Sequence, residues 1–443
     1  MSTIDYLAVY DAAPEAEKFG LARGWLDSEP LPFFAQLRAQ RPILVTPQAT
    51  FIALFHDVTE VLNLPKIFTA ALYLPKMGNG VYLMCHDDDA LHTREKSIMQ
   101  GLLNRDDLPK VRALIGKLAN EVLDAAKGKL EVAYGYSRNV PAGLVQQYFG
   151  LGGIERSELI EWSYWNQYNT FHNQPFDIIS DARRAEITKF HTDTGNKLTM
   201  YIAGLVARRL PVAKARQAGH TLFALWFGLC KLARKLAGRP TEEYSDDIVT
   251  RMFGTSFPDE VDFDIARMAV NAGGLLIGAI ETTAQCATQS IAYLLERPEL
   301  LKQAIAAAKL DDTRAFDGIV WETLRFVPLS PYLFRQAASE YTVGKNTPYQ
   351  TTIAPGTNVL TLTQSAMFDP RVFEQPEEFI ATRNWFQYFT FGFGSHECLG
   401  KYVGMVLIPE LVRQLLLRPG IRAEGAIDRK GGPFPEVFNV RWD

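Results

Sequence analysis

The strongest constraint on the fold comes from residues 391–400, FGFGSHECLG, which place a cysteine among three glycines directly before an apolar helix pattern, CLGKYVGMVLIPELVRQLL. Gly392, Gly394 and Gly400 permit backbone conformations and close approaches that side chains would block. Cys398 is therefore predicted near a helix amino terminus, where unpaired N–H groups and the helix dipole favour a thiolate. The alternative is a buried structural cysteine in a tight turn, the commoner role of a free cysteine.

The rest of the chain predicts a mostly α protein with a minor β portion (α+β). Apolar residues spaced three and four apart indicate helices at residues 104–128, 140–150, 155–171 and 196–210. Residues 49–65 predict a short strand followed by a helix beginning near Asp57, and residues 340–364 predict short strands and turns. Hydrophobic residues make up 47% of the chain and no linker or repeat divides it, so we expect one large domain over residues 1–443.

Charge and targeting features exclude several classes of protein. A net charge of −4 argues against a nucleic-acid partner. The amino terminus resembles no signal peptide, and no run of about 20 apolar residues is long enough for a transmembrane anchor, so a cytoplasmic location is expected. Four scattered cysteines without CxxC spacing make disulfides and structural zinc unexpected.

Residues 220–238, HTLFALWFGLCKLARKLAG, join an apolar run to a basic tail. The segment is too short to span a bilayer. It predicts either an amphipathic helix packed on the body or a surface helix that touches a membrane or guards a substrate entrance.

The cysteine loop resembles the haem-binding loop of the cytochrome P450 family, the haem-thiolate monooxygenases, in its soluble bacterial form. The matching positions, in order and spacing, are Phe391, Gly392, Gly394, His396, Cys398 and Gly400. The resemblance implies haem b as the cofactor, with Cys398 as the axial ligand of the iron and His396 facing a haem propionate. Phe391 and Gly400 belong to the same cofactor-binding set. Residues 210–240 then correspond to an insertion between two family helices.

A second resemblance lies in NAGGLLIGAIETTAQCATQS, a long apolar helix pattern. Each glycine weakens a helix by about 1 kcal/mol relative to alanine, so ordinary helix packing or a function must offset the cost. Gly274, Gly278 and Thr282 are four apart and share one face. The segment resembles the family's distal helix, which implies that Thr282 hydrogen-bonds dioxygen and that Glu281 relays protons.

Two residues of WETLRF, Glu322 and Arg325, stand three apart on one helical face and can form a charged pair. They resemble the Glu-x-x-Arg pair that helps to lock the core of the family on the haem side. Glu378 replaces an arginine often found in a later segment, which leaves Arg383 as a candidate for the third partner. Pro409 falls within the predicted helix after the cysteine and is expected to kink it.

Three basic residues resemble the groups that bind haem propionates in the family. His92 and Lys96 lie four apart in DDDALHTREKSIM, where lysine stands in place of the more usual arginine, and Arg335 lies in PYLFRQA. Each could equally be an ordinary surface charge.

The aromatic helix EWSYWNQYNTF places Trp165, Tyr168 and Phe171 at helical spacing. By analogy with the family this helix roofs the substrate pocket, together with the groove of Gly274 and Gly278, although aromatic stripes also pack cores. The substrate expected from these residues is an apolar small molecule.

The resemblance implies a monooxygenase that inserts one oxygen atom from O2 into its substrate. Its electrons are expected from a ferredoxin or flavodoxin with its reductase, because no flavin, nicotinamide or iron–sulfur sequence follows Cys398. Two alternatives stay open: a peroxide-driven haem-thiolate peroxygenase or peroxidase, and a non-catalytic haem protein that binds small ligands.

Overall fold

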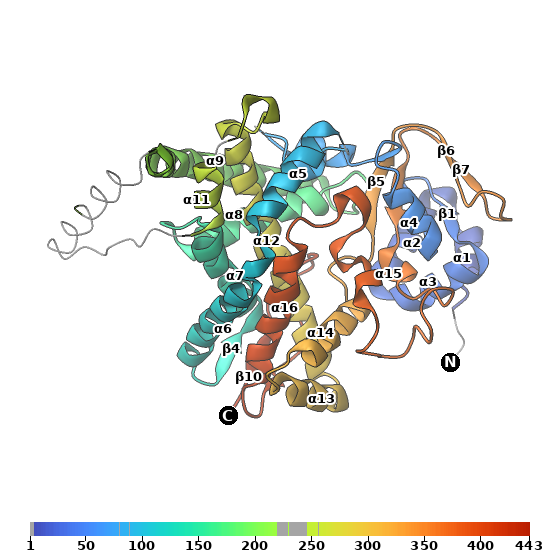
Figure 1. Cartoon of the computed structure of the whole chain (residues 1–443). Helices are drawn as coiled ribbons and strands as arrows, with labels where there is room; N and C mark the ends of the chain where they lie inside the picture. The colour runs from blue at the N-terminus through green and yellow to red at the C-terminus, as the bar shows by residue number, and fades with distance from the viewer. Residues whose placement is uncertain (1–3, 79, 88, 219–228, 230–245, 256) are drawn as a thin grey trace.

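A 31-residue helix, α12 (Ile265–Leu295), runs through the middle of the computed structural model, which describes residues 4–78, 80–87, 89–218, 229, 246–255 and 257–443 (Figure 1). The helix begins where the Asp264 side chain accepts a hydrogen bond from the N–H of Arg267. It packs against α8 (Arg156–Phe171), α14 (Arg314–Phe326) and α16 (Lys401–Leu416). Because it is surrounded by other helices, its many apolar residues are buried.

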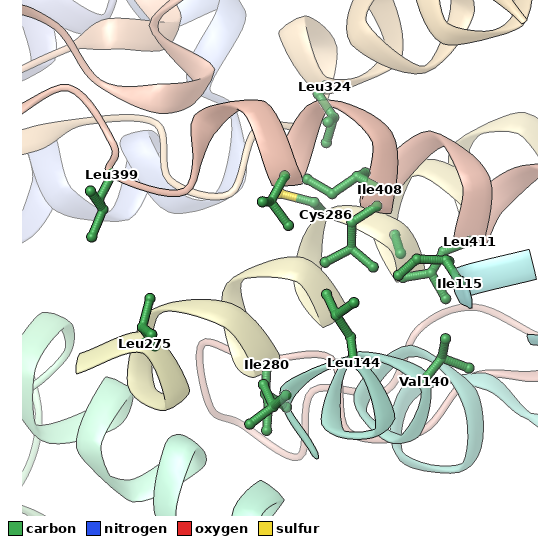
Figure 2. Close-up of a cluster of buried hydrophobic side chains, with 14 of the residues drawn as sticks. Ile115, Val140, Leu144, Leu275, Ile280, Cys286, Leu324, Leu399, Ile408 and Leu411 are labelled. Carbon is green, nitrogen blue, oxygen red and sulfur yellow. The ribbon is translucent and has the colours of Figure 1, made fainter. Parts of the chain in front are cut away.

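Helix α16 follows the cysteine loop and lies against α12 and α6 (Leu108–Ala125). It continues through Pro409, which lies in its buried middle. Figure 2 shows the side chains of the main core that join these helices, among them Cys286 on α12 and Ile408 and Leu411 on α16. This packing fixes α16 against α12, and therefore also fixes the loop that leads into α16.

The remaining helices surround this centre or form the amino-terminal part of the molecule (Figure 1). They are α1 (Tyr6–Ala12), α2 (Glu15–Ser28), α3 (Pro30–Gln40), α4 (Phe55–Leu62), α5 (Ala90–Leu102), α7 (Asn139–Leu144), α9 (Asp181–Ala218), α11 (Ile248–Gly254), α13 (Pro298–Ala308) and α15 (Thr363–Ala366). Short π-helical segments, Ala133–Arg138 and Val145–Phe149, flank α7, so the helix predicted over residues 140–150 is interrupted. Such segments are frequent at functional sites.

The β portion is small and consists of three sheets. The largest has the order β1-β2-β8-β5-β3, in which β2 and β8 are parallel and the other neighbours are antiparallel. Its strands are β1 (Ile43–Val45), β2 (Thr50–Ile52), β8 (Asn358–Thr361), β5 (Leu333–Ala337) and β3 (Phe68–Thr69). The others join β4 (Lys129–Glu131), β10 (Asn439–Arg441) and β9 (Arg422–Ala423), and β6 (Tyr341–Val343) with β7 (Thr351–Ile353).

The mostly α architecture predicted from the sequence is confirmed. The helix expected near Asp57 begins at Phe55, after strand β2, and the helix expected over residues 196–210 is part of the longer α9. The amphipathic segment 220–238 and most of the predicted insertion lie outside the described residues. In the part of the chain that the structure describes, no helix combines the length and the apolar character needed to cross a membrane.

Candidate active site

The loop before α16 needs glycine at two positions. Gly392 and Gly394 have φ angles of 74° and 70°, a region that side chains rarely adopt. A Cβ atom on Gly394 would also lie 2.9 Å from the carbonyl oxygen of Leu62 in α4. These contacts explain why so little side chain surrounds the cysteine.

Cys398 is held by its own loop, three residues before α16 begins. Its N–H donates to the carbonyl oxygen of Phe391 at 2.8 Å, and its sulfur accepts a hydrogen bond from the N–H of Gly400. Burial raises the pKa of the Cys398 thiol, while Gly400 and the ammonium of Lys96 act in the opposite direction. The thiolate expected from the helix terminus is therefore not favoured by the protein groups alone, because burial outweighs them. A coordinated metal ion would deprotonate the thiol.

Open space lies beside the middle of α12. Gly278 is exposed although most of this helix is buried, and a Cβ atom added to it would meet no atom within 4 Å. Thr282 is partly exposed one turn later, and its Oγ1 donates to the carbonyl oxygen of Gly278 at 2.7 Å. At Gly274, by contrast, an added Cβ would overlap the ring of Tyr82. The groove predicted from three small-residue positions is thus open at Gly278 and Thr282 and filled at Gly274.

The cysteine loop lies near this part of α12. Burial raises the pKa of Cys286, which stands one turn after Thr282, and the charge of Cys398 adds to this shift. Burial likewise raises the pKa of Tyr82, and the charge of Cys398 again adds to the shift. Since α16 begins directly after the loop and packs on α12, Cys398 and the open face of α12 lie in the same part of the molecule.

The carboxylate of Glu281 forms an ion pair on a different side of α12 from Gly278 and Thr282. Its carboxylate accepts hydrogen bonds from Nε and Nη2 of Arg138 at 2.7 and 3.1 Å, and both side chains are buried. Arg138 also donates to the carbonyl oxygen of Pro435 at 3.1 Å and lies 3.4 Å from Glu436. Burial raises the pKa of Glu281, and the guanidinium of Arg138 opposes that shift. Sequence analysis missed Arg138, which stands 143 residues before its partner.

The residues predicted to meet haem propionates gather near the loop. The rings of His92 and His396 lie 5.2 Å apart, and Nε2 of His396 is 3.6 Å from Oδ1 of Asp87. Arg335 is buried on β5, where burial lowers its pKa and Asp87 opposes that effect. Two histidines and a buried guanidinium suit the two carboxylates of a haem.

Lys96 lies at the loop itself. Its Nζ donates to the carbonyl oxygens of Ser395 and, at 2.7 Å, of Glu397. These bonds fix the backbone on either side of His396, immediately before the cysteine. Lys96 therefore supports the loop, in addition to the propionate contact that the resemblance implies for it.

Glu322 and Arg325 form a buried ion pair, with Nη2 of Arg325 2.7 Å from Oε1 of Glu322. Arg383 completes the group, since its Nε lies 3.4 Å from the same oxygen and its Nη2 donates to the carbonyl oxygen of Glu378. Tyr388, shortly before the cysteine loop, donates its hydroxyl to Glu322. The structure thus places Arg383 where the sequence left the third partner open.

The aromatic residues of α8 mostly pack against other aromatic rings. Trp165 stacks on Phe190 of α9 with ring centroids 4.5 Å apart, and Tyr168 lies edge-on to Phe434 at 5.2 Å. Phe171 packs against the core of the amino-terminal helices. Trp165 and Tyr168 thus join α8 to α9 and to the carboxyl-terminal segment, which is the core-packing alternative of the sequence analysis.

Comparisons with known proteins point to one family. A family model described as cytochrome P450 matches residues 233–418. Pulcherriminic acid synthase of Bacillus subtilis (strain 168) is 23% identical over 403 residues, 86% of each chain, and the steroid C26-monooxygenase of Mycolicibacterium smegmatis is 21% identical, covering 87% of this chain and 84% of the relative.

Solved structures show the same fold. Cytochrome P450 CYP109Q5 from Chondromyces apiculatus has a TM-score of 0.69 at 18% identity and covers 94% of this chain and 96% of its own. P450BioI, solved in complex with an acyl carrier protein carrying hexadec-9Z-enoic acid, has a TM-score of 0.69 at 18% identity and covers 95% of this chain and all of its own.

The residues present fit the cofactor of that family. The sulfur of Cys398 would bind the iron, the space beside Gly278 and Thr282 is open, and Arg335 is buried nearby with His396. The fold, the cysteine loop and the family match over residues 233–418 together support a cytochrome P450 of the bacterial type, a family of monooxygenases whose cofactor is haem b.

Proposed function

We propose that the protein hydroxylates an apolar small molecule, using O2 and electrons from a separate ferredoxin or flavodoxin with its reductase. The observation that carries the proposal is the meeting of the Cys398 loop with the open face of α12 at Gly278 and Thr282. Haem, when bound through Cys398, supplies the activation of O2. An apolar substrate is supported by the similarity to a protein named as a steroid C26-monooxygenase and to one solved in complex with an acyl carrier protein that carries a fatty acid.

The role proposed for Thr282 is to hold and pass a proton at Oγ1. Its hydroxyl hydrogen is directed to the carbonyl oxygen of Gly278, so its lone pairs remain available on the open side. Glu281 is the proposed proton source, although Arg138 must first release one of its carboxylate oxygens. The contact of Arg138 with Glu436, whose side chain is 20% exposed, gives this pair a route towards solvent.

Replacing Thr282 by alanine is expected to uncouple electron transfer from oxidation. Without the hydroxyl at Oγ1, proton delivery is misdirected and reducing equivalents leave as peroxide, so product per NAD(P)H consumed should fall about 10-fold or more. The measurement is peroxide and product per NAD(P)H with the redox partners present. Thr283→Ala is the matched control, because Thr283 is the buried neighbour on another side of α12. Unchanged coupling in Thr282→Ala would exclude the proposed role.

The spectrum of the dithionite-reduced protein with carbon monoxide tests the proposal as a whole. A strongly red-shifted Soret band is expected from thiolate-ligated haem. A band typical of histidine-ligated haem would refute it. Among proteins with the expected band, equal turnover with peroxide alone would favour a peroxygenase. Ligand binding without substrate-dependent electron consumption would favour a non-catalytic haem protein.

A further inference from the structure

Arg429 lies in the segment between β9 and β10 and contacts α12. Its Nη2 donates to Oε1 of Gln289 at 2.6 Å, and its Nη1 donates to the carbonyl oxygen of Pro433. The side chain is only partly exposed, and burial lowers its pKa, yet a guanidinium stays charged in proteins. Two neutral acceptors therefore orient a cation that is largely removed from water.

Arg429 differs from Arg138 and Arg325 in having no carboxylate beside it. Arg138 pairs with Glu281, and Arg325 pairs with Glu322. Within the described residues no Asp or Glu oxygen lies within ion-pair distance of Arg429, and no carboxylate contributes to its pKa. A charge that is partly buried and unpaired lowers stability unless an anion compensates it. The group that this guanidinium lacks is an anion.

Gln289 places Arg429 on the reactive side of α12. At about 100° per residue, Gly278, Thr282 and Gln289 fall within about 40° of one another around the helix axis. Gln289 follows Thr282 by seven residues, a rise of about 10 Å. Its Nε2 also donates to the carbonyl oxygen of Pro328 at 3.1 Å, in the partly exposed segment that precedes β5. Arg429 thus contacts α12 on the side of the helix axis that carries Gly278 and Thr282, about two turns beyond Thr282.

His172, at the end of α8, adds a polar group near Arg429. Its ring lies 5.1 Å from that of Phe434, in the same segment as Arg429. Burial, with Arg23 and Arg429, lowers the pKa of His172 to about 3, so it is neutral and able to donate one hydrogen bond. Arg23 forms an ion pair with Asp177, with Nη2 3.7 Å from Oδ1, whereas Arg429 forms no ion pair within the described residues.

We propose that Arg429 binds a carboxylate of the substrate, with Gln289 orienting the guanidinium and His172 lying beside it. The inference rests on the proposed function and narrows it, since the substrate then has an apolar body and an acidic end. A guanidinium holds a carboxylate through two parallel hydrogen bonds, which fixes orientation as well as position. The rise of about 10 Å along α12 places the oxidised carbon several bonds from the acid.

The test is a binding titration of the haem-loaded protein, followed by the shift of its Soret band. The probes are octanoate, decanoate and dodecanoate, each compared with the primary amide of the same length. The native protein is expected to bind the acids about 10-fold more tightly than the amides. In Arg429→Gln the dissociation constant of each acid should rise about 10-fold or more, while that of each amide changes less than about twofold. Arg429→Lys should retain part of the preference, because it keeps the charge.

Arg422→Gln is the matched control, since Arg422 lies on neighbouring β9, is half exposed and pairs with Asp443 at 3.0 Å. Arg422→Gln should leave the dissociation constants of the acids and of the amides unchanged. Equal binding of acids and amides by the native protein would overturn the anion site, as would a parallel loss of both in Arg429→Gln. The reduced carbon monoxide spectrum of each sample distinguishes a failure of the carboxylate site from a failure of the proposed function. A red-shifted band without acid preference rejects the carboxylate site alone, and a missing band in the native protein rejects the proposed function with it.

Discussion

Replacing Cys398 by serine is expected to abolish the red-shifted Soret band of the reduced carbon monoxide complex and to reduce substrate oxidation to background. Two hydrogen bonds fix Cys398 in its loop. Its N–H donates to the carbonyl oxygen of Phe391, and its sulfur accepts from the N–H of Gly400. Serine keeps the size of the side chain but supplies a hard oxygen donor that does not push electron density through the iron as a thiolate does. The readouts are the spectrum, the haem content and product formation with redox partners.

Cys286→Ala is the control for loss of a thiol in general. Cys286 is buried on α12 near the site, and burial raises its pKa to about 12, so it is an inert thiol at neutral pH. This variant should keep the red-shifted band and most of the activity. Retention of the band in Cys398→Ser, or its loss in Cys286→Ala, would contradict the assignment of the axial ligand.

The sequence predicted those parts of the site whose residues are near one another along the chain. The pairing of Glu322 with Arg325 follows from a spacing of one helical turn. The shared face of Gly278 and Thr282 follows from the same kind of spacing, four residues apart. The cysteine loop was predictable because Gly392 and Gly394 need backbone conformations that few residues adopt.

The residues that sequence analysis missed meet their partners only through the fold. Arg138 reaches Glu281 because a π-helical segment and α7 pack on α12, and no spacing rule relates positions 143 apart. The available signal was a basic residue within the stretch AYGYSRNVPAGL, whose neighbours are largely uncharged. Arg429 is similar, since its contact with Gln289 spans 140 residues. A local pattern also could not tell whether Trp165 would face a pocket or the ring of Phe190.

Replacing Arg138 by leucine is expected to lower the free energy of unfolding at pH 7 by about 3–5 kcal/mol, because Glu281 would stay buried without its cation. The double variant Arg138→Leu/Glu281→Leu should regain most of the loss, since both charges are then removed and apolar groups fill the space. Urea denaturation followed by circular dichroism measures both. A double variant as unstable as Arg138→Leu would show that the single change acts through packing and not through the unpaired carboxylate.

The loss of unfolding free energy in Arg138→Leu should also depend on pH. The pKa of Glu281 determines whether this loss grows or shrinks as the pH falls. Burial raises that pKa in the folded state above its unfolded value of about 4.3, and removing the opposing guanidinium raises it further. Between the unfolded and folded pKa values the folded variant holds a proton that the unfolded chain has released, so its stability increases as pH falls through this window. The difference from the native protein should therefore narrow between pH 8 and pH 5. A constant difference across that range would mean that Glu281 does not carry the charge responsible for the loss.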